Sequence, residues 1–93
     1  MDELARESER LYNNVKKYCG PNCPPSAKRL EEMSRKLYDD FRGIINPREL
    51  ERQATAIKES LYHSMEGGEM LTTHCSELKD GYEKLRLSLR KFQ

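Results

Sequence analysis

Residues 71–92, which read LTTHCSELKDGYEKLRLSLRKF, contain the most regular pattern of the chain. Apolar residues recur in this stretch at spacings of 4, 3, 4, 3, 4 and 3, namely Leu71, Cys75, Leu78, Tyr82, Leu85, Leu89 and Phe92. A 4-3 spacing sustained in this way places the apolar side chains on one face of an α-helix, where they can pack against another helix. The pattern predicts a helix over 69–92.

A related pattern precedes this stretch. Asn46-Pro47-Arg48-Glu49 indicates a helix start, because Asn caps free backbone N–H groups and Pro is tolerated at the first helical position. Apolar residues then follow at spacings of 4, 3 and 4, at Leu50, Ala54, Ile57 and Leu61. This segment predicts a helix over 47–66.

Gly67 and Gly68 separate the two patterns. Because adjacent glycines normally end a helix, we expect a turn here and a long C-terminal helical hairpin. The apolar spacing nevertheless stays in phase across the glycines. One continuous C-terminal helix is therefore the alternative, at a cost of about 1 kcal/mol per glycine.

Two further helices are expected over 2–18 and 26–42. Their apolar residues have helical spacing, at Leu4, Leu11, Val15 and Tyr18 in the first and Ala27, Leu30, Met33, Leu37 and Phe41 in the second. Three prolines in residues 20–25 remove N–H donors and end the first helix. The sequence thus predicts one all-α domain over 1–93, a three- or four-helix bundle or coiled coil.

The residues flanking the last pattern favour a bundle over an isolated two-stranded coiled coil. His74, Gly81 and Ser88 occupy one flank, where a two-stranded coil usually carries long charged side chains. Small residues at such positions allow a third or fourth helix to approach closely.

Charge and hydropathy exclude several classes of function. The 17 Lys and Arg nearly balance the 16 Asp and Glu, so no basic excess points to nucleic acid. No apolar run reaches the ~18 residues that span a bilayer, so we expect no membrane insertion. Three cysteines and the lack of a signal-peptide pattern predict an intracellular, cytoplasmic protein, with nucleus and mitochondrion left open.

Two chemical alternatives deserve a test. Cys19 and Cys23 could form a metal or redox module, with His74 and Cys75 as further zinc ligands. Adjacent His74 and Cys75 would point about 100° apart on a helix, so unpaired loop thiols at Cys19 and Cys23 are expected, with a local disulfide as the alternative. Binding to an anionic membrane or nucleic acid is the other alternative, through Lys84, Arg86, Arg90 and Lys91.

The favoured function is that of a non-enzymatic helical scaffold or adaptor subunit, with no cofactor or metal. Leu, Ile, Val and Phe number only 11, 3, 1 and 2, so we expect a partner protein to supply part of the burial. The partner would be helical, in a hetero- or homo-oligomer. It would contact nine residues, here called the seam residues: Leu50, Ile57, Leu61, Leu71, Leu78, Tyr82, Leu85, Leu89 and Phe92.

Overall fold

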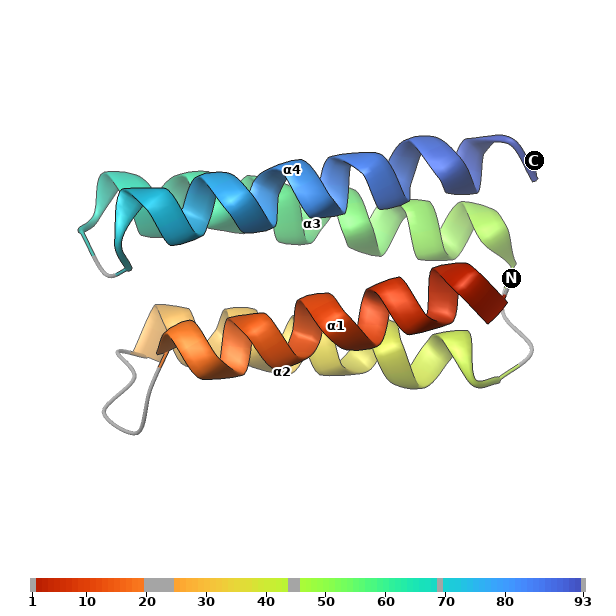
Figure 1. Ribbon diagram of the computed structural model, residues 1–93, viewed down its shortest axis with the longest axis horizontal. Helices are drawn as coiled ribbons and strands as arrows, with labels where there is room; N and C mark the ends of the chain where they lie inside the picture. The colour runs from red at the N-terminus through yellow and green to blue at the C-terminus, as the bar shows by residue number, and fades with distance from the viewer. Residues whose placement is uncertain (1, 20–24, 44–45, 69, 93) are drawn as a thin grey trace.

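The computed structural model of the protein describes residues 2–19, 25–43, 46–68 and 70–92 and contains four α-helices in these ranges (Figure 1). The helices are α1 (Asp2–Cys19), α2 (Pro25–Phe41), α3 (Pro47–Glu66) and α4 (Thr72–Arg90). The prediction of an all-α fold is confirmed for these residues, and the four helices pack as a bundle.

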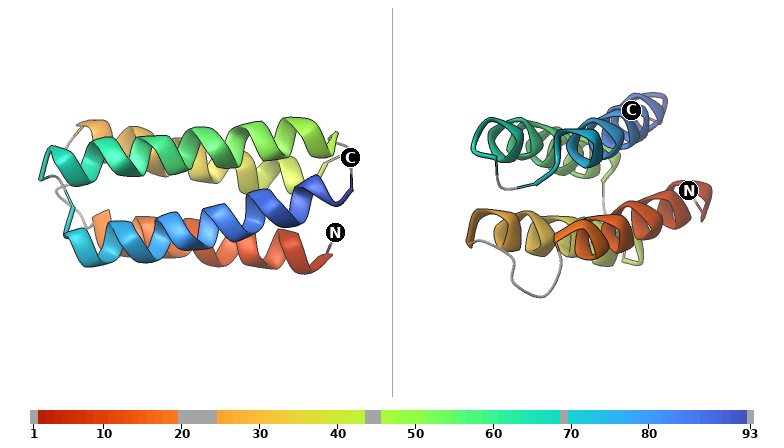
Figure 2. Two further views of the ribbon diagram at one scale, coloured as in Figure 1. Left: turned by 90° about the horizontal axis from the view of Figure 1, so that it is seen from above. Right: turned by 60° about the vertical axis from the view of Figure 1, so that its left-hand side comes forward.

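The bundle has two layers, each made of two helices. α1 lies beside α2 in one layer and α3 beside α4 in the other, and each helix runs opposite to the one before it (Figures 1 and 2). Contacts between the layers join α2 to α3 and α1 to α4. The longest dimension is 35 Å, so helices of 17 to 20 residues run along most of the bundle.

Local signals at both ends of α3 explain its bounds. The side chain of Asn46 accepts a hydrogen bond from the N–H of Arg48 at 2.8 Å, and Pro47 takes the first helical position, as predicted. At the other end Gly68 has a φ of 68°, a left-handed conformation that favours glycine. The alternative of one continuous C-terminal helix is therefore wrong, because α3 ends at Glu66 and α4 begins at Thr72.

The last helix is shorter than the predicted 69–92. Leu71 precedes α4 and is 68% exposed, while Met70 beside it is buried. Phe92 follows the end of α4 and is 54% exposed. The stripe that faces the core therefore covers Cys75 to Leu89 and includes neither Leu71 nor Phe92.

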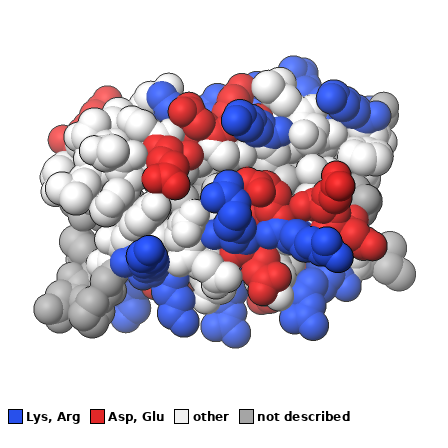
Figure 3. Space-filling view, viewed as in Figure 1, with Lys and Arg blue, Asp and Glu red and all other residues white. Residues whose placement is uncertain are grey.

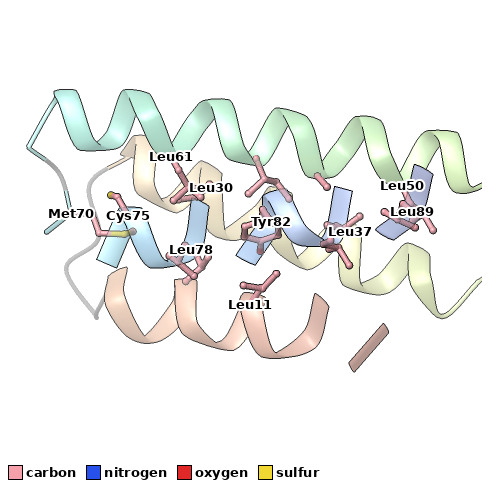
Figure 4. Packing of buried hydrophobic residues seen from close by; sticks show 14 residues of the cluster. Leu11, Leu30, Leu37, Leu50, Leu61, Met70, Cys75, Leu78, Tyr82 and Leu89 are labelled. Atoms are coloured by element: carbon pink, nitrogen blue, oxygen red, sulfur yellow. The ribbon is translucent and has the colours of Figure 1, made fainter. Parts of the chain in front are cut away.

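The core lies between the two layers and takes side chains from all four helices (Figure 4). Tyr82 is its largest fully buried side chain and lies near Leu11, Leu37 and Leu78 in the close view. The hydroxyls of Tyr82 and Ser34 are buried without a hydrogen-bond partner in the described part of the chain. The core centre therefore holds two hydroxyls, and that of Ser34 lies close enough to Tyr82 to influence its pKa.

α1 packs against the flank of α4 that carries the small residues. A β-carbon added at Gly81 would lie 2.5 Å from Leu11 Cδ2, so the two helices touch closely there. About two helical turns before it, the His74 ring stacks on Tyr18 with 3.9 Å between ring centres. The prediction that this flank lets another helix approach is confirmed at Gly81.

Candidate binding surfaces

Most of the seam residues lie inside the bundle. Seven of the nine are at most 1% exposed, namely Leu50, Ile57, Leu61, Leu78, Tyr82, Leu85 and Leu89. They pack against one another and against residues of α1 and α2, including Leu11 and Leu30. In the folded bundle a partner can therefore reach only Leu71 and Phe92 of the nine.

Phe92 lines a groove at the end of the bundle where α1 begins and α4 ends. α4 runs away from α1 toward its C-terminal end (Figure 2). The resulting groove has a volume of about 520 Å³. We call it the end groove, and its lining residues are Asp2, Glu3, Leu4, Ser88, Lys91 and Phe92. The sequence pattern placed Leu4 on an apolar stripe but gave no sign that this stripe borders a groove.

A second hollow lies between α2 and α3, near the opposite end of the bundle. We call it the serine pocket; its volume is about 270 Å³, and its lining residues are Ser26, Arg29, Leu30, Met33, Ser60, His63 and Ser64. A smaller hollow of about 160 Å³ adjoins it at Met33 and is also lined by Lys36, Gln53 and Ala56. His63 is exposed and lies beside this pocket.

The cysteines differ from one another in state. Cys19 is disulfide-bonded, so the expectation of an unpaired thiol is wrong at this position, and Cys23 lies outside the described residues. Cys75 is free and 1% exposed, and burial raises the pKa of its thiol. The described residues contain no group of three His, Cys, Asp or Glu that could hold a metal ion. Cys75 therefore acts as a small apolar residue of the core.

Two of the basic side chains near the C-terminal end, Arg86 and Arg90, pair with glutamates of α3 and α4. Arg86 lies 2.7 Å from Glu83 and 3.6 Å from Glu51, and Arg90 lies 3.1 Å from Glu51. Positive and negative side chains are mixed over the middle of the face formed by α1 and α4, an area near the start of α4 carries no charge, and Lys and Arg predominate along the lower edge of the view (Figure 3). The pairing of Arg86 and Arg90 with glutamates reduces the positive charge that the end of α4 could offer to phosphates.

None of the described helices combines the length and the apolar character needed to span a membrane. Comparisons with protein-family models, with curated proteins and with solved structures found no match to the chain. Its function must therefore be argued from the surfaces described above.

Proposed function

We propose that the protein is a non-enzymatic helical adaptor that holds one helix of a partner protein in the end groove. The observation that carries this proposal is the position of Phe92, a large apolar side chain that is 54% exposed and borders a groove of about 520 Å³. Leu4 lines the same groove from α1. An apolar side chain of the partner would remove water from both, at about 25 cal/mol per Å² of apolar surface buried.

The charges around the end groove favour a helix with a defined direction. Asp2 and Glu3 lie on the α1 side and Lys91 on the α4 side, and all three are exposed. A partner helix with Lys or Arg toward α1 and Asp or Glu toward α4 complements both sides. Such charges select the partner and its orientation more than they add affinity.

The adaptor does not need its partner to cover the core. Seven seam residues are already buried by the chain itself, so we propose that the α3 and α4 hairpin serves as the frame that presents Phe92. Binding would then involve a small surface at one end of the bundle. The expected affinity depends on how well one or two apolar side chains of the partner fit, and not on the seam as a whole.

The test compares Phe92→Asp with Leu87→Asp in affinity purification from cells, followed by mass spectrometry. Leu87 is the matched control, because it is 47% exposed on the same helix and does not line the end groove. Far-UV circular dichroism must first show that both variants stay helical. We expect a partner that is recovered with the wild type and with Leu87→Asp but lost with Phe92→Asp.

Two other outcomes would count against the proposal. Equal recovery of partners with both variants would mean that the end groove is not the binding surface. A wild type that forms a dimer in solution, and that Phe92→Asp converts to a monomer, would assign the groove to a second copy of the chain instead of a different protein.

A further inference from the structure

The face formed by α2 and α3 lies opposite the face formed by α1 and α4 (Figure 2). Three hollows follow one another along it. The serine pocket shares Met33 with the smaller hollow beside it, and this hollow shares Ala56 with a third one of about 400 Å³ that is lined by α3 alone. We call this row of hollows the α2/α3 groove. Met33 and Ala56 are only half-buried, so apolar surface at the centre of this face stays in contact with water.

Two contacts show which residues of α2 and α3 stand beside each other along the groove. Gln53 Nε2 donates to Asp40 Oδ2 at 2.6 Å, and the Ser60 hydroxyl lies 3.7 Å from the Met33 sulfur. The two contacts are separated by seven residues on each helix, and the helices run in opposite directions. One register therefore holds along the groove, and it gives the level of every other residue on the two helices.

Charges of opposite sign flank the groove at two levels. Lys36 of α2 lies within about 3 Å of the level of Glu59 of α3, and Asp40 of α2 lies within about 2 Å of the level of Arg52 of α3. Glu59 is exposed and forms no ion pair with the described residues. Lys36 pairs with Asp40 of its own helix, but 65% of its side chain is exposed. Arg52 pairs with Glu49 and is 77% exposed. At each level the charge on α2 is thus opposite to the charge on α3.

We propose that the protein forms a symmetric dimer in which the α2/α3 groove of one copy packs against that of a second copy. A two-fold axis parallel to the helices places α2 of each copy over α3 of the other and leaves every residue at its level. Lys36 of each copy then meets Glu59 of the other, and Asp40 meets Arg52. The same operation brings the two apolar strips together and removes them from water. A surface that complements itself in this way selects a second copy over an unrelated helix.

The size of this face suits a dimer. The bundle measures 35 × 20 × 17 Å, so the flat outline of a long face covers about 600–700 Å². A stable interface of standard size buries roughly 800 Å² on each partner, and the accessible area of an uneven face exceeds its outline. Because the two-fold axis runs along the helices, both end grooves would open at the same end of the dimer. The dimer itself does not depend on the proposed adaptor function.

Analytical ultracentrifugation of the full chain, at concentrations up to about 1 mM, tests the proposal. The wild type should reach twice the 10.9 kDa of the single chain. A mass that stays at 10.9 kDa over this range would overturn the proposal. Phe92→Asp should dimerise as the wild type does, because Phe92 lines the end groove and not the α2/α3 groove. A dimer that Phe92→Asp abolishes would place the second copy in the end groove and contradict the arrangement proposed here.

Charge reversal tests whether α2 meets α3 of the other copy. Lys36→Glu and Glu59→Lys should each weaken dimerisation about tenfold or more, because like charges then face each other twice in a symmetric dimer. Arg35→Glu is the control, since Arg35 precedes Lys36 but lines none of the three hollows, and it should change the affinity less than about twofold. Circular dichroism must show that all three variants stay helical. Equal losses in Lys36→Glu and Arg35→Glu would contradict the proposed contact.

A mixture of the two single variants gives the sharpest comparison. In a mixed dimer the two introduced charges face each other and are opposite in sign, and native Lys36 of one chain faces native Glu59 of the other. The mixture should therefore dimerise within about threefold of the wild-type affinity, although each variant alone does not. A mixture that dimerises as weakly as the separate variants would overturn the proposal, because α2 would then not lie over α3 of the second copy.

Discussion

Gly81 of α4 lies against Leu11 of α1, with no room for a side chain between them. A β-carbon at position 81 would be 2.5 Å from Leu11 Cδ2, whereas carbon atoms in favourable contact are about 3.5–4.0 Å apart. Leu11 is 1% exposed, so its side chain has no open space into which it could turn. Glycine at position 81 therefore sets how closely α1 and α4 can pack.

Gly81→Ala should destabilise the protein by about 1–2 kcal/mol. Overpacking of a core costs about 1–3 kcal/mol, and the gain in helix propensity from Gly to Ala, about 1 kcal/mol, offsets part of it. Urea unfolding measures the difference. Gly43→Ala is the control, because the nearest atom to its added β-carbon is a carbonyl oxygen 3.8 Å away. Stabilisation of Gly81→Ala would mean that α1 and α4 are less closely packed than described.

Leu78→Ala should lower the free energy of unfolding by about 2–5 kcal/mol, since Leu78 is fully buried and its truncation leaves a cavity. The same truncation at Leu87, which is 47% exposed on the same helix, should change it by no more than about 0.5 kcal/mol. Thermal or urea unfolding of both variants gives the comparison. Similar losses at the two positions would show that a partner or second copy covers Leu87 in solution.

Tyr82→Phe should stabilise the protein at neutral pH by about 1 kcal/mol. The Tyr82 hydroxyl is buried without a hydrogen-bond partner, although Ser34 lies beside it, so removing the hydroxyl removes a cost of burial. Ser34→Ala serves as a second variant, because its hydroxyl is also buried and unpartnered. A loss of stability in Tyr82→Phe would indicate that a water molecule or a short rearrangement satisfies the two hydroxyls.

The difference in the free energy of unfolding between the wild type and Tyr82→Phe should be larger at alkaline pH than at neutral pH. Burial raises the pKa of Tyr82 well above its usual value of about 10, so the unfolded chain loses this proton at a lower pH than the folded chain. The native state then binds more protons than the unfolded state, and stability falls as pH rises above about 10, by up to about 1.4 kcal/mol per pH unit. Urea unfolding from pH 9 to 11 should show this fall in the wild type and a smaller one in Tyr82→Phe.

Acid should destabilise the protein by protonating Glu83. This residue of α4 forms an ion pair with Lys58 of α3. The neighbouring Arg86 and Lys58 lower the pKa of Glu83 from 4.5 to about 2, and its carboxylate lies 2.6 Å from Lys58 Nζ. Because the folded state holds this carboxylate ionised, the stability it provides is present above about pH 4.5 and is lost as pH falls toward 2. Unfolding curves of Glu83→Gln should depend less on pH in this range. An unchanged acid dependence would show that the ion pair contributes little in solution.

The four helices could be predicted from apolar spacing, and the limits of 47–66 could also be predicted from residues next to them in the sequence. The bounds of 47–66 agree with α3 at both ends, since Asn46 and Pro47 begin it and Gly67 and Gly68 follow its last residue. Leu71 and Phe92 were misplaced because the apolar spacing continues beyond the helix itself. Leu71 makes no side-chain capping hydrogen bond, so no residue marks where α4 begins.

The candidate sites were less predictable, because each one joins residues that lie far apart in the chain. The serine pocket combines Arg29 with His63 and Ser64, and the end groove combines Leu4 with Phe92. Periodicity shows which side chains leave a helix on the same face but not which helix lies beside that face. Which helices lie side by side depends on contacts such as that of Gly81 with Leu11, and these contacts are visible only in the folded chain.

Both ends of the described chain border the same groove, since Asp2 and Phe92 line it together, and the two ends lie at one end of the bundle (Figure 1). Each helix contacts the helix before and after it, and α1 contacts α4, so the contacts form a closed circle. The same pairs of helices would therefore be in contact wherever along this circle the chain began and ended. A permuted gene that joins the two ends through a short linker and opens at Gly67 and Gly68 would keep every helix pair while making α4 the first helix.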